Sequence, residues 1–109
     1  SILGSVGFVN ASAYTAAKHG VIGLTQTAAA EYSKLGIRVN AVGPGFINTP
    51  LLSKAGIEDD AKKALVMLHP IGRLGEASEV GELVYWLCSE KASFVTGSYY
   101  PVDGGYLAV

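Results

Sequence analysis

The 109-residue sequence has few cysteines and few charged residues, and each scarcity excludes a class of protein. Its one cysteine, Cys88, cannot form an internal disulfide and is typical of a reducing compartment such as the cytoplasm. Charged residues make up 16% of the chain, the net charge is −1 and no basic stripe occurs, which argues against nucleic acid or an anionic membrane as partner. No run of about 18 apolar residues occurs, so we expect no transmembrane helix.

Hydrophobic residues and glycine, in contrast, are abundant. Half of the residues are hydrophobic and 14 are glycine. This profile favours a buried α/β core over a disordered or fibrous chain. The length allows one domain at most.

The first 18 residues carry three groups that can act on one substrate oxygen. Tyr14 and Lys18 lie four positions apart in a helix predicted over residues 13–35, so they project from the same side, one turn apart. A nearby ammonium favours the ionised form of a phenol, which can then exchange a proton with a hydroxyl or carbonyl oxygen. Ser1 comes from the loop before this helix, and its hydroxyl can hydrogen-bond the same oxygen.

The Tyr-x-x-x-Lys pair alone is a weak signal. Chance gives roughly 0.4 such pairs in a chain of this composition, so a surface pair is the alternative interpretation. Gly4 and Gly7 accompany the pair, and three further motifs follow it, at residues 40–50, 70–80 and 95–105. In this order the four stretches resemble the short-chain dehydrogenase/reductase family, over all 109 residues.

The resemblance implies both a fold and an activity. The fold is α/β: the C-terminal part of a doubly wound, Rossmann-type parallel sheet, with two strands, two long helices and a substrate lid inserted at residues 46–72. The activity is hydride transfer between NAD or NADP and a small secondary alcohol or ketone. Tyr14 would be the acid/base, Lys18 would favour its ionised form and bind the nicotinamide ribose, and Ser1 would orient the substrate oxygen. The family also implies a cytoplasmic homo-oligomer, either a dimer or a tetramer.

A second group of predicted site residues follows a short strand at residues 37–42. Ligands of doubly wound sheets bind beyond the carboxyl ends of the strands, so the Gly-Pro-Gly turn that ends this strand lies at the binding edge. Pro44 fixes the turn, and Gly45 lets the backbone approach a flat ring. The resemblance implies that the Ile47 backbone and the Thr49 hydroxyl contact the nicotinamide carboxamide. An ordinary turn from strand to loop is the alternative.

The predicted lid, residues 46–72, contains a short helix opened by the acidic residues 58–60 and ended by Pro70. Its apolar side chains suggest a hydrophobic or neutral substrate, although core packing would explain them equally well. Neither His19 nor His69 has partners at metal-ligand spacing, so we interpret both as packing or surface residues and expect no metal site.

The long helix at residues 13–35 has two distinct faces, and Gly36 is predicted to end it. An apolar stripe predicted to be buried comprises Ala17, Val21, Leu24, Ala28 and Leu35. A face of small residues, predicted to pack on a helix of a second subunit, comprises Ala16, Gly20, Gly23, Thr27 and Ala30.

A second long helix is predicted at residues 77–89 and a last strand at residues 99–102. The helix face expected to pack on the sheet comprises Val80, Leu83, Val84 and Leu87.

No glycine-rich turn between a first strand and a helix is present to hold a pyrophosphate. Gly43 and Gly45 end a strand, and Gly104 and Gly105 follow the last strand. We therefore expect the chain to be the C-terminal portion of a longer enzyme. The alternative is a chain without catalysis that acts only as an oligomerisation or binding module. The choice between NAD and NADP and the substrate both stay open; thioester, cyclic diol, sugar and steroid substrates are all compatible.

Overall fold

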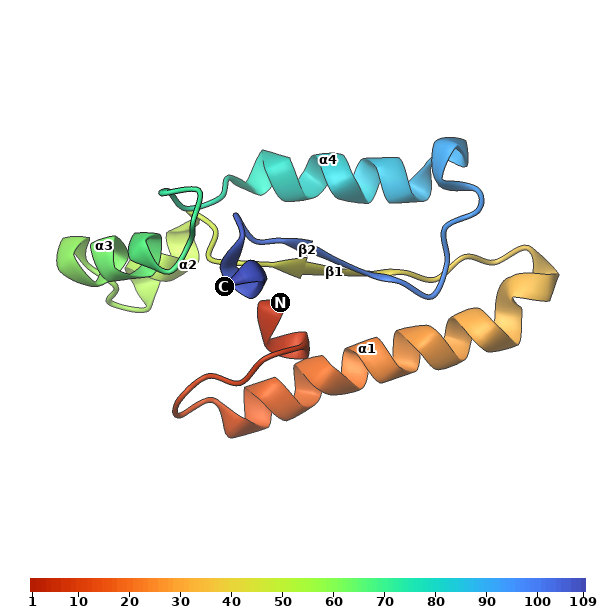
Figure 1. Cartoon of the computed structure of the whole chain (residues 1–109), viewed down its shortest axis with the longest axis horizontal. Helices are drawn as coiled ribbons and strands as arrows, with labels where there is room; N and C mark the ends of the chain where they lie inside the picture. Colours follow the sequence, from red (N-terminus) through yellow and green to blue (C-terminus); the bar gives the residue numbers. More distant parts are fainter.

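The computed structural model describes residues 1–109 as three layers (Figure 1). A parallel sheet of two strands, β1 (Ala41–Pro44) and β2 (Tyr99–Val102), lies in the middle. Helix α1 (Ser12–Tyr32) covers one face of the sheet and α4 (Ala77–Cys88) covers the other. The prediction of an α/β chain with two parallel strands and two long helices is confirmed. Single-turn 3-10 helices occupy Ile2–Gly4, Ser33–Leu35, Glu90–Ala92 and Tyr106–Ala108.

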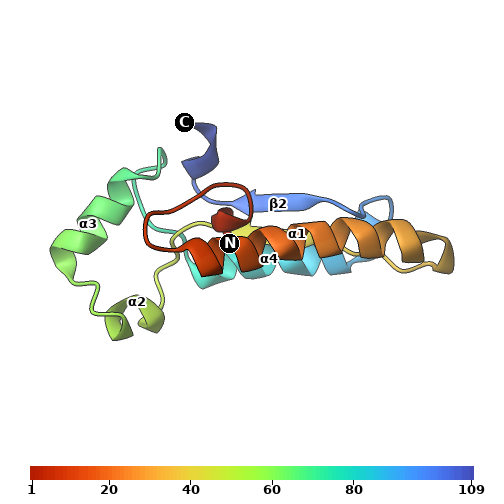
Figure 2. The ribbon, with the colours of Figure 1, turned by 90° about the horizontal axis from the view of Figure 1, so that it is seen from below.

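The connection between the strands carries the predicted insert. Parallel strands need a long crossover, and here it contains α2 (Pro50–Lys54), α3 (Asp59–Met67) and α4. Helices α2 and α3 project beyond the end of the sheet, and both termini of the chain lie at that same end (Figures 1 and 2). The insert, the N-terminal turn and the C-terminal turn thus gather at the carboxyl ends of the strands.

Two predicted features of the helix termini are confirmed, although α1 ends at Tyr32 and α3 at Met67, each three residues or less before the predicted end. The turn after α1 ends at Gly36, whose φ of +78° is in the left-handed region that glycine adopts at little cost. Asp59 and Asp60 form the first turn of α3, where negative charge is favourable. None of the helices combines the length and hydropathy needed to cross a membrane.

The first strand begins and ends later than predicted: it runs over Ala41–Pro44 instead of 37–42, so Gly43 and Pro44 pair in the strand and do not form the predicted turn. Residues 37–40 lie outside the regular ladder, and side chains take part in the hydrogen bonds that join them to residues 95–98. The Val39 N–H donates to the Thr96 hydroxyl at 3.0 Å. The Asn40 amide donates to the Val95 carbonyl at 2.9 Å and accepts from the Ser98 N–H at 3.2 Å. Regular pairing therefore starts at Ala41, opposite Tyr99.

The prediction that the apolar stripe of α1 is buried in the core is wrong. Val21, Leu24 and Leu35 are 49%, 70% and 71% exposed. The buried positions are instead Thr25 and Ala29, and the Thr25 hydroxyl donates to the Val21 carbonyl at 2.8 Å. Only small side chains fit on the inward face of α1, because the backbone of Gly97 comes close to it. A β-carbon at Gly97 would lie 3.3 Å from the β-carbon of Ala29.

The second helix matches its prediction more closely. Leu87 is buried and Val80 and Leu83 are half-buried, whereas Val84 is 42% exposed at the edge of the packed face. The five small residues of α1 are all exposed on this chain, so a second subunit can reach them. Their packing on another helix stays a prediction.

Candidate active site

Two of the three predicted catalytic groups line one pocket of about 490 Å³ at the carboxyl end of the sheet. Ser1 comes from the N-terminal turn and Tyr14 from the first turn of α1. The predicted cofactor-binding residues line the same pocket: Pro44, Gly45, Ile47 and Thr49. No charged side chain lines it, and the insert contributes Leu51 and Leu52.

Lys18 lies beside this pocket rather than in its lining. Its ammonium is 5.2 Å from the centroid of the Tyr14 ring, within the range of a cation–π contact, which confirms that both project from one side of α1. Ser1 and Tyr14 line the same pocket. Ser1, Tyr14 and Lys18 are therefore neighbours at one corner of the molecule.

Ser1 is held by three interactions that leave its hydroxyl hydrogen free. Its hydroxyl oxygen accepts the Leu3 N–H at 3.1 Å, its carbonyl accepts the Tyr99 hydroxyl at 2.9 Å, and its nitrogen lies 3.5 Å from the Val42 carbonyl oxygen. A serine hydroxyl can accept and donate at once, so this hydroxyl can still donate to a molecule in the pocket.

Tyr99 is a supporting residue that the sequence analysis missed. Burial raises the pKa of its phenol, so the hydroxyl stays protonated and can donate to Ser1. A β-carbon at Gly43 would overlap the Tyr99 hydroxyl, so Gly43 makes room for this side chain to cross β1. The glycine before Pro44 was the available signal, but it did not identify its partner.

The backbone of Ile47 has two unpartnered hydrogen-bonding groups. Its neighbours bind Gly75: the Asn48 N–H donates to the Gly75 carbonyl at 2.8 Å, and the Gly75 N–H donates to the Phe46 carbonyl at 3.1 Å. In a parallel bridge these bonds turn the N–H and C=O of the central residue away from the partner strand. The Ile47 N–H and C=O make no hydrogen bond within the chain.

Thr49 also keeps a free group. It is the N-cap residue of α2, yet its side chain makes no capping hydrogen bond. A threonine at this position ordinarily satisfies a backbone N–H of the first helical turn. Its hydroxyl therefore remains available beside the pocket that Ile47 also lines.

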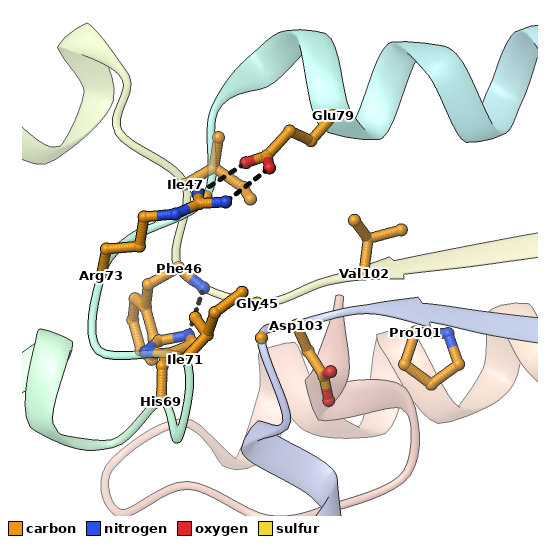
Figure 3. Close-up of a pocket in the computed structure, with 12 residues that line it drawn as sticks. Gly45, Phe46, Ile47, His69, Ile71, Arg73, Glu79, Pro101, Val102 and Asp103 are labelled. Atoms are coloured by element: carbon orange, nitrogen blue, oxygen red, sulfur yellow. Dashed lines mark hydrogen bonds and ion pairs between the residues drawn. The ribbon is translucent and has the colours of Figure 1, made fainter.

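The flat ring that approaches Gly45 within this chain is the imidazole of His69. A β-carbon at Gly45 would lie 2.9 Å from His69 Nε2. His69 is 3% exposed and both ring nitrogens are hydrogen-bonded, which confirms its interpretation as a packing residue. Figure 3 shows the ring beneath the Gly45–Phe46 backbone, with the bond from the Phe46 nitrogen to the ring drawn as a dashed line.

A bidentate ion pair closes the turn that contains Gly75. The Arg73 guanidinium donates to the two carboxylate oxygens of Glu79 at 2.9 and 2.8 Å (Figure 3). Glu79 also accepts the Glu76 N–H at 2.8 Å, which completes a capping box at the start of α4. The hydrogen bonds from Arg73, and next the Glu76 N–H, lower the pKa of Glu79 to about 2.

Replacing Glu79 with glutamine is expected to remove an acid-sensitive part of the stability. Because folding lowers the pKa of this carboxyl to about 2, its contribution is complete above about pH 4.5 and is lost as the pH falls toward 2. Melting temperatures of the wild type and the variant, measured in a complete enzyme from pH 7 down to pH 3, should differ most at pH 7 and converge on acidification. A constant difference would contradict this assignment, and Glu82→Gln is the control because Glu82 makes no ion pair.

Comparison with known proteins identifies the family of this chain. A family model described as enoyl-(acyl carrier protein) reductase matches residues 1–107. The chain belongs to the short-chain dehydrogenase/reductase family. It is 55% identical over 106 residues to a cyclohexanol dehydrogenase of Acinetobacter sp. (strain SE19), covering 97% of this chain and 40% of that protein. It is 51% identical over 109 residues to a cis-4-hydroxycyclohexanecarboxylate dehydrogenase of Sinomonas cyclohexanicum, covering 100% of this chain and 43% of that protein.

Solved structures show the same fold. A candidate 2-deoxy-d-gluconate 3-dehydrogenase of Agrobacterium tumefaciens, solved with bound NADP, superposes with a TM-score of 0.93 at 38% identity. The alignment includes 100% of this chain and 44% of that chain. The aldohexose dehydrogenase of Thermoplasma acidophilum gives a TM-score of 0.92 at 40% identity, and the alignment includes 100% of this chain and 46% of that chain. This chain therefore spans less than half the length of these relatives and has the architecture of the Rossmann-type dehydrogenases over that part.

Proposed function

We propose that this chain is the substrate-side part of an oxidoreductase that transfers a hydride between NAD or NADP and a secondary alcohol or ketone. The observation that carries the proposal is one pocket lined by Ser1, Tyr14 and Ile47, and the backbone N–H and C=O of Ile47 are unpartnered. Dehydrogenases acting on alcohol groups are among the similar proteins, which supports the same chemistry here.

The free polar groups fit a nicotinamide carboxamide. That group has one acceptor oxygen and one amino donor, and the Ile47 N–H and C=O offer the complementary donor and acceptor. The Thr49 hydroxyl can supply one more hydrogen bond, and Pro44 and Gly45 provide the adjoining wall. When bound, the coenzyme would accept or supply the hydride.

Tyr14, Lys18 and Ser1 would carry out the proton transfer. Tyr14 would exchange a proton with the substrate oxygen, and the nearby Lys18 ammonium would stabilise its ionised form. The Ser1 hydroxyl, already an acceptor for Leu3, would donate to the same oxygen and hold it near the phenol. Lys18 would also bind the nicotinamide ribose.

The pocket favours a neutral, apolar substrate. Its walls include Leu3, Phe46, Leu51 and Leu52 and no charged side chain, so a carboxylate or phosphate on the substrate would find no counter-charge. Leu51 and Leu52 come from the insert, which we propose acts as the substrate lid. One of the similar proteins is named for cyclohexanol, a neutral cyclohexane-ring alcohol. A carbocyclic secondary alcohol is accordingly the substrate class that we propose.

The test uses a chimera in which this chain replaces the matching 106 residues of the cyclohexanol dehydrogenase. Reduction of NAD or NADP with cyclohexanol, followed by absorbance, should be observed. Thr49→Val keeps the shape of the side chain and removes the hydroxyl, so it should raise the coenzyme KM about tenfold, the equivalent of one hydrogen bond. A folded chimera that binds NADH without turnover would contradict the proposal, and Ser78→Ala, which removes an exposed hydroxyl of α4 outside the pocket lining, is the control.

We also propose that the complete protein is a cytoplasmic homo-oligomer, either a dimer or a tetramer. The exposed small-residue face of α1 supports an interface because small side chains let another backbone approach. The free, exposed thiol of Cys88 suits a reducing compartment. The same exposed face is what favours the alternative function, in which the chain acts only as an oligomerisation module.

A further inference from the structure

We propose that His69 is a positioning residue that aims the coenzyme-binding backbone of Ile47. The inference rests on the proposed function, because it assumes that the Ile47 N–H and C=O bind the coenzyme. It assigns to a buried histidine, which lines the neighbouring pocket of Figure 3 but not the pocket of Ser1 and Tyr14, a role in coenzyme affinity rather than in packing alone.

The hydrogen bonds of His69 assign its tautomer. The Phe46 N–H can only donate, and it lies 3.2 Å from Nε2, so Nε2 is unprotonated and accepts. The ring hydrogen must then be at Nδ1, which donates to the Leu65 carbonyl of α3 at 2.8 Å. His69 thus connects α3, in the insert, to the segment that leaves β1, and it uses both ring nitrogens to do so.

Three consecutive peptide groups are fixed in this segment. The first, before Phe46, is held by His69; the second and third are held by the N–H and C=O of Gly75. A peptide group is planar and trans, so fixing the Phe46 carbonyl fixes the Ile47 N–H, and fixing the Asn48 N–H fixes the Ile47 carbonyl. His69 is the only side chain among these restraints. Without it, the first peptide group would lose its only hydrogen bond, and the two Gly75 bonds alone would orient the N–H and C=O of Ile47.

The surroundings of the imidazole leave it little freedom. The Phe46 ring meets it edge-on with centroids 5.8 Å apart, and the Tyr106 ring lies 5.5 Å away. On the backbone side, Gly45 allows the closest approach, since a β-carbon there would lie 2.9 Å from Nε2 and 3.0 Å from the Asp103 Cα. The neighbouring side chains therefore hold the imidazole in one orientation independently of its hydrogen bond to the Phe46 N–H. A positioning residue needs such a fixed orientation.

Two variants of the chimera separate positioning from packing. Glutamine places its amide oxygen where Nε2 lies, so His69→Gln keeps the acceptor for the Phe46 N–H. Asparagine reaches only as far as Nδ1, so His69→Asn keeps the bond to Leu65 and loses the one to Phe46. Both variants remove the ring and about the same packing area.

We expect the dissociation constant for NADH, titrated by its fluorescence, to rise about tenfold in His69→Asn and to stay within about twofold of wild type in His69→Gln. The kcat at saturating coenzyme should change little in either variant, while the coenzyme KM follows the dissociation constant. Equal increases in both variants, in step with equal losses of melting temperature, would show packing alone and overturn the inference.

A measurement on the unaltered chimera covers the case in which a variant does not fold. Nitrogen NMR with labelled histidine should show His69 as the Nδ1–H tautomer, and the opposite tautomer would overturn the inference. A folded wild-type chimera that binds no NADH would instead overturn the proposed function and the inference that rests on it. A chimera that binds NADH, but whose two variants bind it equally weakly, would overturn the inference alone.

Discussion

Replacing Tyr14 with phenylalanine is expected to lower the kcat of the complete enzyme by 10²–10⁴-fold or more, the range of general acid–base catalysis. The substitution removes the hydroxyl that exchanges a proton with the substrate and keeps the aromatic ring. The ring's contact with the Lys18 ammonium therefore persists, and the hydroxyl of Ser1 is untouched. The effect should fall on turnover rather than on folding.

Three measurements isolate that effect. The rate of coenzyme reduction gives kcat, NADH fluorescence gives the dissociation constant, and a thermal melt reports folding. We expect a large fall in kcat with a dissociation constant within about threefold of wild type, because the coenzyme contacts assigned to Ile47 and Thr49 are unaffected. Tyr85→Phe is the matched control, because Tyr85 is 77% exposed on α4, away from the pocket.

An unchanged kcat in Tyr14→Phe would remove Tyr14 from the mechanism. It would leave the oxidoreductase without its proposed proton-transfer group, because the other hydroxyl-bearing residues that line the pocket, Ser1 and Thr49, are assigned to the substrate oxygen and to the coenzyme. Such a result would favour the alternative in which this chain serves only as an oligomerisation module.

The sequence predicted where the candidate site residues lie better than it predicted the residues that support them. Tyr14 and Lys18 come together because helical periodicity places residues four apart on one side, a local rule that depends on nothing else in the chain. Ile47 and Thr49 follow a strand, and the carboxyl ends of strands are where ligands bind in such sheets. Both inferences needed only the type of element and the position within it.

The supporting residues lie far apart in the sequence, and no local rule relates them. Tyr99 binds the carbonyl of Ser1 across 98 positions, and His69 binds the Phe46 N–H across 23. Each contact depends on a glycine that makes room for a ring, at Gly43 and Gly45. A glycine in the sequence indicates that another group can approach the backbone closely, but it does not identify the residue that provides that group.

The buried face of α1 could not be predicted for a related reason. Val21 and Leu24 are more hydrophobic than Thr25 and Ala29, yet they are exposed and the smaller residues are buried. Hydrophobicity predicts which residues should be covered by some surface, and it does not say whether that surface belongs to this chain or to another. Periodicity thus identified a real apolar stripe, but the core of these 109 residues does not cover it.

That exposed stripe leads to the second large prediction: the isolated 109-residue chain should not melt cooperatively. Only 10 of its 109 residues are buried, and no large side chain is completely enclosed. Leu24, Leu35 and Phe94 are 70%, 71% and 102% exposed. A parallel sheet is normally covered on both faces, and two strands alone do not form a stable one.

Calorimetry and near-ultraviolet circular dichroism of the purified chain test this prediction. A folded domain of this length should absorb about 70–80 kcal/mol in one transition near 60 °C. We expect a broad, weak transition, little near-ultraviolet signal and strong binding of a hydrophobic dye, or an insoluble product. The chimera is the control: it carries the same 109 residues and should show the full cooperative transition.

A sharp melt of the isolated chain would contradict the prediction, and its concentration dependence would say why. Association of two copies through the small-residue face of α1 would make the melting temperature rise with protein concentration. Replacing Gly23 with leucine on that exposed face should then abolish the transition, whereas the same change would barely affect a folded monomer, because a β-carbon at Gly23 meets no atom of this chain within 4 Å. The outcome decides whether the exposed surfaces of these 109 residues are covered by another part of the same enzyme or by a second copy of the chain.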